Sequence, residues 1–455
     1  MALGELPPQN IGNSAMNETE NKLAARDLAW WLHPIAIFVG LNGLTGAAAF
    51  LADSKIYMEL WRTPKYFTEF TALVTVGVLI VFSVGARLGA GNRSDYSDEV
   101  GWRGTVSFPR ALVLFNLSFW LCITAYVVWI ALGISRGLSI GALKLIFTGG
   151  ADVLTLRTYL ETVPGVTTCT QFGIAAVVLG CLIGSSVGWR IVRGKLAILF
   201  LLALVRALVY SERLAFLELA IPLLVLYFAE PVSWTGRRWL RAVVRLAPLV
   251  GATFIYIVFT SFEYFRSWSS YYSAKESNLF QFGFWRLLGY YVTSANNTAY
   301  LISRVHDSLN APYFSLHFLW EFPVLNVYVK DIFSWVHLDY DGYMNLLAAG
   351  ANPEFNNPGG LLSPVVDFGV AGGLAYWGIM GLVTGYLYRL YKTNHPLGMC
   401  MYPVAFLTLT EVPRYLFWGE GRAFPALAYL LLSAFFMVRS ATHFETFTQP
   451  ELQAD

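Results

Sequence analysis

Charged residues are scarce in this sequence. Asp, Glu, Lys and Arg together make up 13% of its 455 residues, whereas soluble domains average about 25%. Apolar residues make up 56%, and the mean hydropathy is +0.52. The net charge of +2 excludes a globally basic, nucleic-acid-binding protein. This composition is typical of an integral membrane protein.

Cysteine motifs and metal-ligand motifs are also lacking. The cysteines lie in or beside apolar runs without a CxxC pair, which favours core packing over a disulfide framework or a zinc site. No metal-ligand spacing joins the histidines either, so we predict no metal site and no cofactor. The residues concerned are Cys122, Cys169, Cys181 and Cys400, and His33, His306, His317, His337, His395 and His443.

Long apolar runs make up much of the remaining sequence. Runs that approach or reach the roughly 20 residues needed to cross a bilayer occur near 30–52, 67–87, 111–132, 168–188, 246–262, 365–388, 397–413 and 421–438. The stretch 196–229 is too long for one span and is interrupted by Arg206, Glu212 and Arg213. It divides into 196–210 and 213–229, which are either interrupted helices beside a cavity or a hairpin with a charged tip. The sequence therefore predicts an all-α, polytopic membrane bundle of about ten transmembrane segments.

The distribution of Lys and Arg predicts the orientation of the chain. About half of the 31 basic residues fall in one alternate set of mostly short loops, which marks the cytoplasmic side. The polar start lacks the pattern of a cleavable signal peptide. We therefore expect a cytoplasmic tail over 1–28, transmembrane segments 1–7 over 29–262, an outward loop over 263–364, segments 8–10 over 365–438 and a cytoplasmic tail over 439–455.

The outward loop is rich in Trp and Tyr and too long to be unstructured in a compact protein. We expect amphipathic helices on the outer membrane interface, with the aromatic side chains at headgroup depth. A separate soluble domain is the alternative.

A set of arginines falls on this outward face. Arginine at the centre of a membrane helix costs about 2.5–3.5 kcal/mol, and its planar guanidinium matches phosphate oxygens in pairs. Each arginine alone is equally consistent with a structural ion pair or a headgroup contact. As a set they predict a site for a lipid diphosphate: Arg213, Arg266, Arg286, Arg414 and Arg422.

Three carboxylates on the same face are candidates for a catalytic base that deprotonates an attacking hydroxyl. Glu354 ranks first, although it could instead cap a loop. Asp367 could N-cap a helix that begins with Phe368, and Glu411 could pair with Arg414 three residues later.

Nearby polar and aromatic residues suggest a sugar site. Asn296 and Asn297 could hold sugar hydroxyls, and Tyr290 and Tyr291 could stack on sugar rings, although Asn pairs are also common in turns. The motif DFGVAGG (367–373) lacks the other motifs of a kinase. Its small residues, with Gly378 and Gly385, predict close helix packing.

Several segments resemble bacterial oligosaccharide repeat-unit polymerases, the Wzy-type O-antigen and exopolysaccharide polymerases. They are RALVYSERLAFLELAIPLLVLYF (206–228), EYFRSW (263–268), RLLGYYVTSANN (286–297), NPEFNNPGGLLSPVVDFGVAGG (352–373) and EVPR (411–414). The span pattern is similar over nearly the whole chain.

This resemblance implies a metal-independent, GT-C-like glycosyltransferase of the bacterial inner membrane. Such an enzyme transfers a growing glycan from undecaprenyl diphosphate onto the terminal sugar of an incoming lipid-linked repeat unit, at the periplasmic face. Its partners would be the lipid-linked oligosaccharide, membrane lipid and a possible chain-length-regulating co-polymerase, with no nucleic acid. Arg213, Arg266, Arg286 and Arg414 would then contact the diphosphates.

Other functions remain open. An O-antigen ligase would use the same donor with a lipid A core acceptor. A flippase or transporter would place charged residues along a path through the membrane, and the intramembrane Glu69 and Glu218 suit such a path. A membrane scaffold would not need the arginine set.

Overall fold

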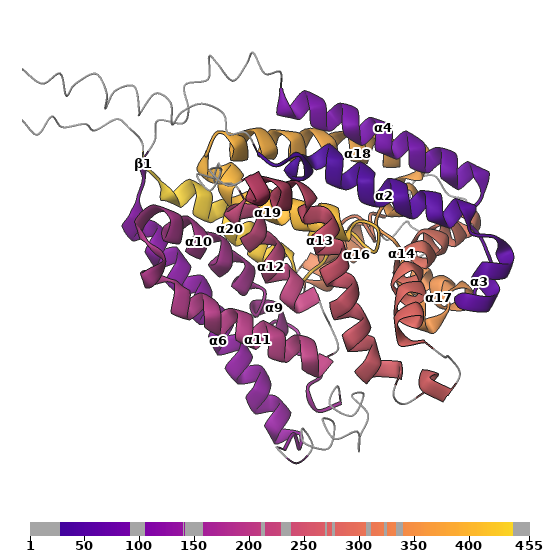
Figure 1. Cartoon of the computed structure of the whole chain (residues 1–455), viewed down its shortest axis with the longest axis horizontal. Coiled ribbons are helices and arrows are strands. Elements are labelled where there is room, and N and C mark those ends of the chain that lie inside the picture. The colour runs from indigo at the N-terminus through magenta and orange to yellow at the C-terminus, as the bar shows by residue number, and fades with distance from the viewer. Residues whose placement is uncertain are drawn as a thin grey trace, which may run out of the picture.

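The computed structural model describes residues 28–91, 105–139, 141, 158–210, 214–228, 238–268, 271–274, 278–305, 311–322, 325–333 and 340–439. These parts of the chain are helical, apart from a short antiparallel pairing of β1 (Thr105–Val106) with β2 (Val438–Arg439) (Figure 1). The predicted all-helical fold is confirmed. The expected tails lie almost entirely outside the described residues.

A helix coincides with each apolar segment predicted from the sequence. These helices are α2 (Pro34–Leu51), α4 (Glu69–Ala90), α6 (Phe108–Ser135), α10 (Phe172–Val187), α11 (Arg193–Tyr210), α12 (Leu214–Tyr227), α13 (Arg238–Glu263), α18 (Ser363–Lys392), α19 (Pro396–Glu411) and α20 (Phe424–Met437). Within the described ranges, 6 helices are long and apolar enough to cross a membrane, and α12 and α20 are shorter apolar helices. The structure thus has the features of a helical membrane bundle, while the count of ten spans stays a prediction.

Local sequence signals set several helix starts. His33 caps α2 and is followed by Pro34, and His395 and Pro396 repeat the arrangement at α19. Thr68 and Thr71 form a capping box at the start of α4. These side chains satisfy backbone N–H groups that have no partner within the helix.

Among the described helices, α4 and α18 make the most extensive contact and run in parallel (Figure 1). A Cβ atom at Gly85 would overlap the carbonyl oxygen of Gly378, and one at Gly385 would overlap that of Ala86. Phe82 of α4 stacks on Phe38 of α2 with ring centroids 3.7 Å apart. The small residues of α18 therefore permit close helix packing, as the sequence predicted.

The residues between α13 and α18 form shorter helices around one long one. The long helix α14 (Leu279–Arg304) packs against α2, α13, α17 and α18. The others are η4 (Tyr264–Trp268), η5 (Tyr272–Ala274), α15 (Phe318–Glu321), α16 (Leu325–Ile332), α17 (Tyr340–Gly350) and η6 (Pro353–Phe355), and α3 (Ser54–Leu60) precedes α4. The described part of the predicted outward loop is thus packed onto the bundle. Its position at the membrane interface stays a prediction.

Candidate functional site

Helix α14 organises the site through two buried asparagines. Asn296 donates to the carbonyl of Pro64 (2.8 Å) and accepts from the backbone of Tyr66 (2.6 Å) and Phe67 (3.0 Å). Asn297 donates to the carbonyls of Phe355 (2.7 Å) and Asn357 (2.9 Å). Both amides are therefore used to hold backbone segments. This geometry favours a structural role over the predicted contact with sugar hydroxyls.

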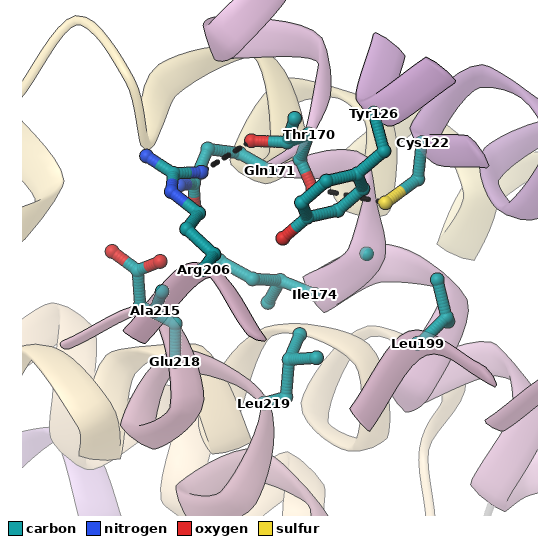
Figure 2. Close-up of a pocket in the computed structure, with 11 residues that line it drawn as sticks. Cys122, Tyr126, Thr170, Gln171, Ile174, Leu199, Arg206, Ala215, Glu218 and Leu219 are labelled. Carbon is teal, nitrogen blue, oxygen red and sulfur yellow. Dashed lines mark hydrogen bonds between the residues drawn. The ribbon is translucent and has the colours of Figure 1, made fainter. Parts of the chain in front are cut away.

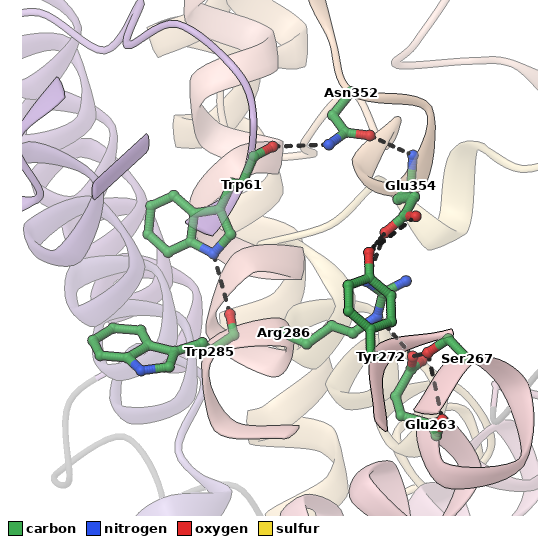
Figure 3. A network of polar contacts seen from close by, with 8 residues as sticks. All are labelled: Trp61, Glu263, Ser267, Tyr272, Trp285, Arg286, Asn352 and Glu354. Atoms are coloured by element: carbon green, nitrogen blue, oxygen red, sulfur yellow. Dashed lines mark hydrogen bonds and ion pairs between the residues drawn. The ribbon is translucent and has the colours of Figure 1, made fainter. Parts of the chain in front are cut away.

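Arg286, one helical turn before Tyr290, is the centre of a polar network (Figure 3). Its Nε lies 2.7 Å from Oε2 of Glu263, and its Nη1 lies 2.7 Å from Oε2 of Glu354. The rings of Tyr272, Phe282 and Phe355 lie 5.4 to 5.6 Å from its guanidinium carbon. Burial lowers the pKa of Arg286, but Glu263 and Glu354 with the neighbouring Tyr290 together outweigh it and hold the pKa above its ordinary value.

The two carboxylates of this network differ in accessibility. The Glu263 side chain is 0% exposed and accepts a hydrogen bond from Ser267 (3.0 Å), whereas the Glu354 side chain is 44% exposed. The Tyr272 hydroxyl donates to Glu354 (3.1 Å). Glu354 is thus the accessible carboxylate, and Arg286 and Tyr272 fix its orientation.

Backbone hydrogen bonds connect the Glu354 loop to the segment that carries Arg414. Gly359 donates to the carbonyl of Arg414 and Gly360 donates to that of Val412, both at 2.9 Å. Gly359 has a φ of +75°, and a Cβ there would overlap the carbonyl of Ser294. Glycine is required at this position because both the backbone conformation and the space exclude a side chain.

Arg414 and Arg422 both contact the ring of Tyr415, which lies between them in sequence. Their guanidinium carbons lie 5.6 and 5.8 Å from the ring centroid of Tyr415, and Arg422 donates to its hydroxyl (2.9 Å). Arg414 pairs with Glu411 at 3.1 Å. In the described part of the chain, the buried Nε of Arg414 has no hydrogen-bond partner.

Tyr290 connects the two groups of arginines. Its ring lies 5.2 Å from that of Phe355, which itself contacts Arg286, and Tyr290 and Tyr291 both lie near Arg414. Arg286, Arg414 and Arg422, three of the five arginines that were predicted as one set, therefore belong to one continuous polar and aromatic region. Arg213 lies outside the described residues, and of Arg266 only the backbone in η4 is described.

The other candidate bases have structural partners. Asp367 is fully buried and accepts the backbone N–H groups of Phe314 (3.2 Å) and Ser315 (2.7 Å). It lies in α18 two residues before the kink at Gly369 (φ +69°), and its carboxylate holds the 314–315 backbone. Glu411 pairs with Arg414, which was the alternative interpretation of that residue. Glu354 alone combines exposure with fixed orientation.

A second cluster of polar side chains lies near the charged interruption of the 196–229 stretch. Arg206 of α11 hydrogen-bonds to Thr170, and Gln171 and Tyr126 line the same small pocket (Figure 2). Glu218 of α12, also in this pocket, lies 3.8 Å from Arg422. Glu218, a buried acid within an apolar helix, is therefore paired with an arginine of the candidate site. Glu69, by contrast, is exposed in the first turn of α4, where the helix dipole favours a negative charge.

Sequence reasoning missed Tyr272 and Tyr415, and it missed a cluster of His317, Glu321 and Glu420. Tyr415 is adjacent to Arg414 and could have been included on that basis. His317 and Glu321 are four positions apart, a spacing that places both on one helix face, whereas Tyr272 and Glu420 meet partners from distant segments.

Comparisons of the chain with protein-family models, with curated proteins and with solved structures found no match. The fold and the site thus define a class only: a helical protein with membrane-length apolar helices and a charged, aromatic site.

Proposed function

We propose that this chain is a membrane glycosyltransferase that polymerises lipid-linked oligosaccharide repeat units. The nascent glycan would leave undecaprenyl diphosphate and join the terminal sugar of an incoming repeat unit at the periplasmic face of the inner membrane. The resemblance to repeat-unit polymerases supports this proposal, as does the connection among Arg286, Arg414 and Arg422. Chain length would be set with a co-polymerase.

The observation that supports the proposal most directly is the unsatisfied Nε of Arg414. A buried hydrogen-bond donor without a partner costs about 1–3 kcal/mol, and Nε of Arg414 is such a donor. The neighbouring Arg422 contacts the same Tyr415 ring. A diphosphate bound here would supply the missing acceptor and would match the positive charge of both guanidinium groups.

In the proposed reaction, Glu354 is the base and the arginines stabilise the leaving group. The acceptor hydroxyl attacks the anomeric carbon of the donor glycan, a new C–O bond forms, and the bond to the diphosphate breaks. Glu354 takes the proton of the hydroxyl, and Arg414 and Arg422 stabilise the charge on the departing diphosphate. Arg286 and Tyr272 act as positioning residues for Glu354.

Substitution of Arg414 tests this proposal. Arg414→Ala should abolish chain elongation by the reconstituted protein, and Arg414→Lys should restore little of it because an ammonium lacks the planar fork. The matched control is Arg304→Ala, since Arg304 is an exposed arginine that contacts the ring of Tyr300. Normal glycan lengths from a folded Arg414→Ala protein would refute the assignment.

The acceptor distinguishes a polymerase from a ligase. Cells without a polymerase should carry single repeats on lipid A, whereas cells without a ligase should accumulate undecaprenyl-linked polymer. We expect the first outcome.

A further inference from the structure

His317, Glu321 and Glu420 form a compact cluster that the proposed transfer reaction does not use. His317 immediately precedes α15, Glu321 ends that helix, and Glu420 follows η7 (Phe417–Gly419). One nitrogen or oxygen atom from each side chain lies within 4.8 Å of those of the other two. The cluster contains the ligand types that divalent transition metals prefer, an imidazole and two carboxylates.

The spacing of the atoms suits a shared ion. Nδ1 of His317 lies 3.8 Å from Oε1 of Glu321 and 3.6 Å from Oε2 of Glu420. Both separations exceed the usual length of a hydrogen bond. Ligands at about 2.0–2.1 Å from a tetrahedral ion lie roughly 3.4 Å from one another, so a small contraction would complete the site.

The surrounding structure holds these ligands in place. The backbone N–H of Gly421 donates to Oε2 of Glu321 (2.8 Å), which leaves Oε1 directed at the imidazole. The rings of Phe318 and Phe424 stack 4.2 Å apart and join the two segments. Asp367 anchors the backbone at Ser315, two residues before His317.

The electrostatics of the cluster favour a cation. The carboxylates of Glu321 and Glu420 both face the His317 imidazole, so the cluster offers two negative charges to a cation.

We propose that His317, Glu321 and Glu420 bind one divalent transition-metal ion, of the class of Zn²⁺ or Mn²⁺. The side chains of these residues are 14%, 46% and 26% exposed, so an ion can enter from solvent and retain water in its open positions. The ion joins the 311–322 segment to the 417–424 segment. Its role is to fasten these segments, and the proposed transfer chemistry proceeds through the arginines without it.

Metal binding by the full-length protein in detergent tests this proposal. The protein is stripped with a chelator and dialysed, and binding of Zn²⁺ is then measured by calorimetry and by metal analysis after desalting. Wild-type protein should retain one ion per chain, whereas Glu420→Gln and His317→Asn should bind at least about tenfold more weakly. Co²⁺ provides a spectroscopic probe, because loss of the imidazole should change its visible absorption.

Glu59→Gln is the matched control, because Glu59 is an exposed acid outside the cluster. It should bind Zn²⁺ like the wild type. Thermal unfolding of the metal-free proteins tests whether each variant is folded. Glu321→Gln is a further cluster variant, and it preserves the shape of the side chain. Equal binding by the wild type and the cluster variants, or equal loss in Glu59→Gln, would show that His317 is only a protonated partner of two carboxylates.

Discussion

Arg286 lies between two carboxylates from different segments, each 2.7 Å away. Its removal would leave Glu263, which has no exposed side-chain area, as an uncompensated buried charge. Arg286→Gln should therefore lower the free energy of unfolding by about 3–5 kcal/mol. Thermal unfolding followed by tryptophan fluorescence measures this loss.

A double variant separates the buried charge from lost packing. Glu263→Gln combined with Arg286→Gln removes both charges, so it should be markedly more stable than Arg286→Gln alone. Equal destabilisation of the two proteins would contradict the ion-pair account.

Tyr272 allows a test of positioning without a large change in stability. Burial and the Glu354 carboxylate raise the pKa of Tyr272, so its hydroxyl keeps its proton and donates to Glu354 at neutral pH. Tyr272→Phe should lower the kcat for elongation severalfold, change KM little, and cost about 0.5–1.5 kcal/mol of stability. Tyr271→Phe, at the adjacent and more exposed ring, is the control. Unchanged kcat in Tyr272→Phe would remove Tyr272 from the proposed site.

At the residue scale, the sequence predicted that Arg286 and Arg414 share one region, but it did not predict what Arg286 contacts. The partner of Arg286, Glu354, is 68 positions away in sequence, and the carbonyl held by Asn296 is 232 positions away. No local pattern encodes such contacts, which is why the sequence predicts a sugar contact for Asn296 whereas its amide holds backbone in the structure.

Among the helices, α4 and α18 offer the sharpest test of packing. Gly85→Ala places a methyl group against the carbonyl of Gly378 and should destabilise the protein by about 1–3 kcal/mol. Gly40→Ala on α2 is the same change where no atom lies within 4 Å, and it should be neutral or slightly stabilising because alanine favours helix. Thermal unfolding measures the stability of each variant. Equal stability would mean that the two helices are not in close contact.

The positions of the apolar helices could be predicted because each is a continuous apolar run. The division of 196–229 was also predictable from its charged centre, and α12 begins at Leu214. The long helix α14 was less predictable, since its buried face includes Arg286, Asn296 and Asn297. These polar residues obscure the apolar periodicity that identifies a helix in sequence.

For the whole molecule, the distribution of Lys and Arg predicts which end of the bundle faces outward. Lys55 lies between α2 and α4 and is exposed, whereas the exposed Arg190 lies between α10 and α11. In a variant without native cysteines, Lys55→Cys should react with an impermeant thiol reagent in intact spheroplasts. Arg190→Cys should react only after permeabilisation. The reverse pattern would place the arginine site on the cytoplasmic side and contradict the proposed function.

Residues far apart in sequence meet because the helices that carry them pack side by side. The parallel packing of α4 and α18 brings together the segments that precede them. Asn296 and Asn297 of α14 then hold the 64–67 segment and the 355–357 segment, and Gly360 binds Val412. The sequence predicted that these segments share a face, but the hydrogen bonds that join them depend on tertiary structure.

The most direct measurement of the central claim is polymerisation by purified protein. The wild type and Arg414→Ala, in matched nanodiscs, are given only the undecaprenyl-diphosphate-linked repeat unit, and the products are sized. We predict a ladder of repeat units and released undecaprenyl diphosphate from the wild type, and unreacted single repeats from Arg414→Ala. If the wild type forms no bond between repeat units, or if Arg414→Ala produces the same ladder, the proposed role of the arginine site is wrong.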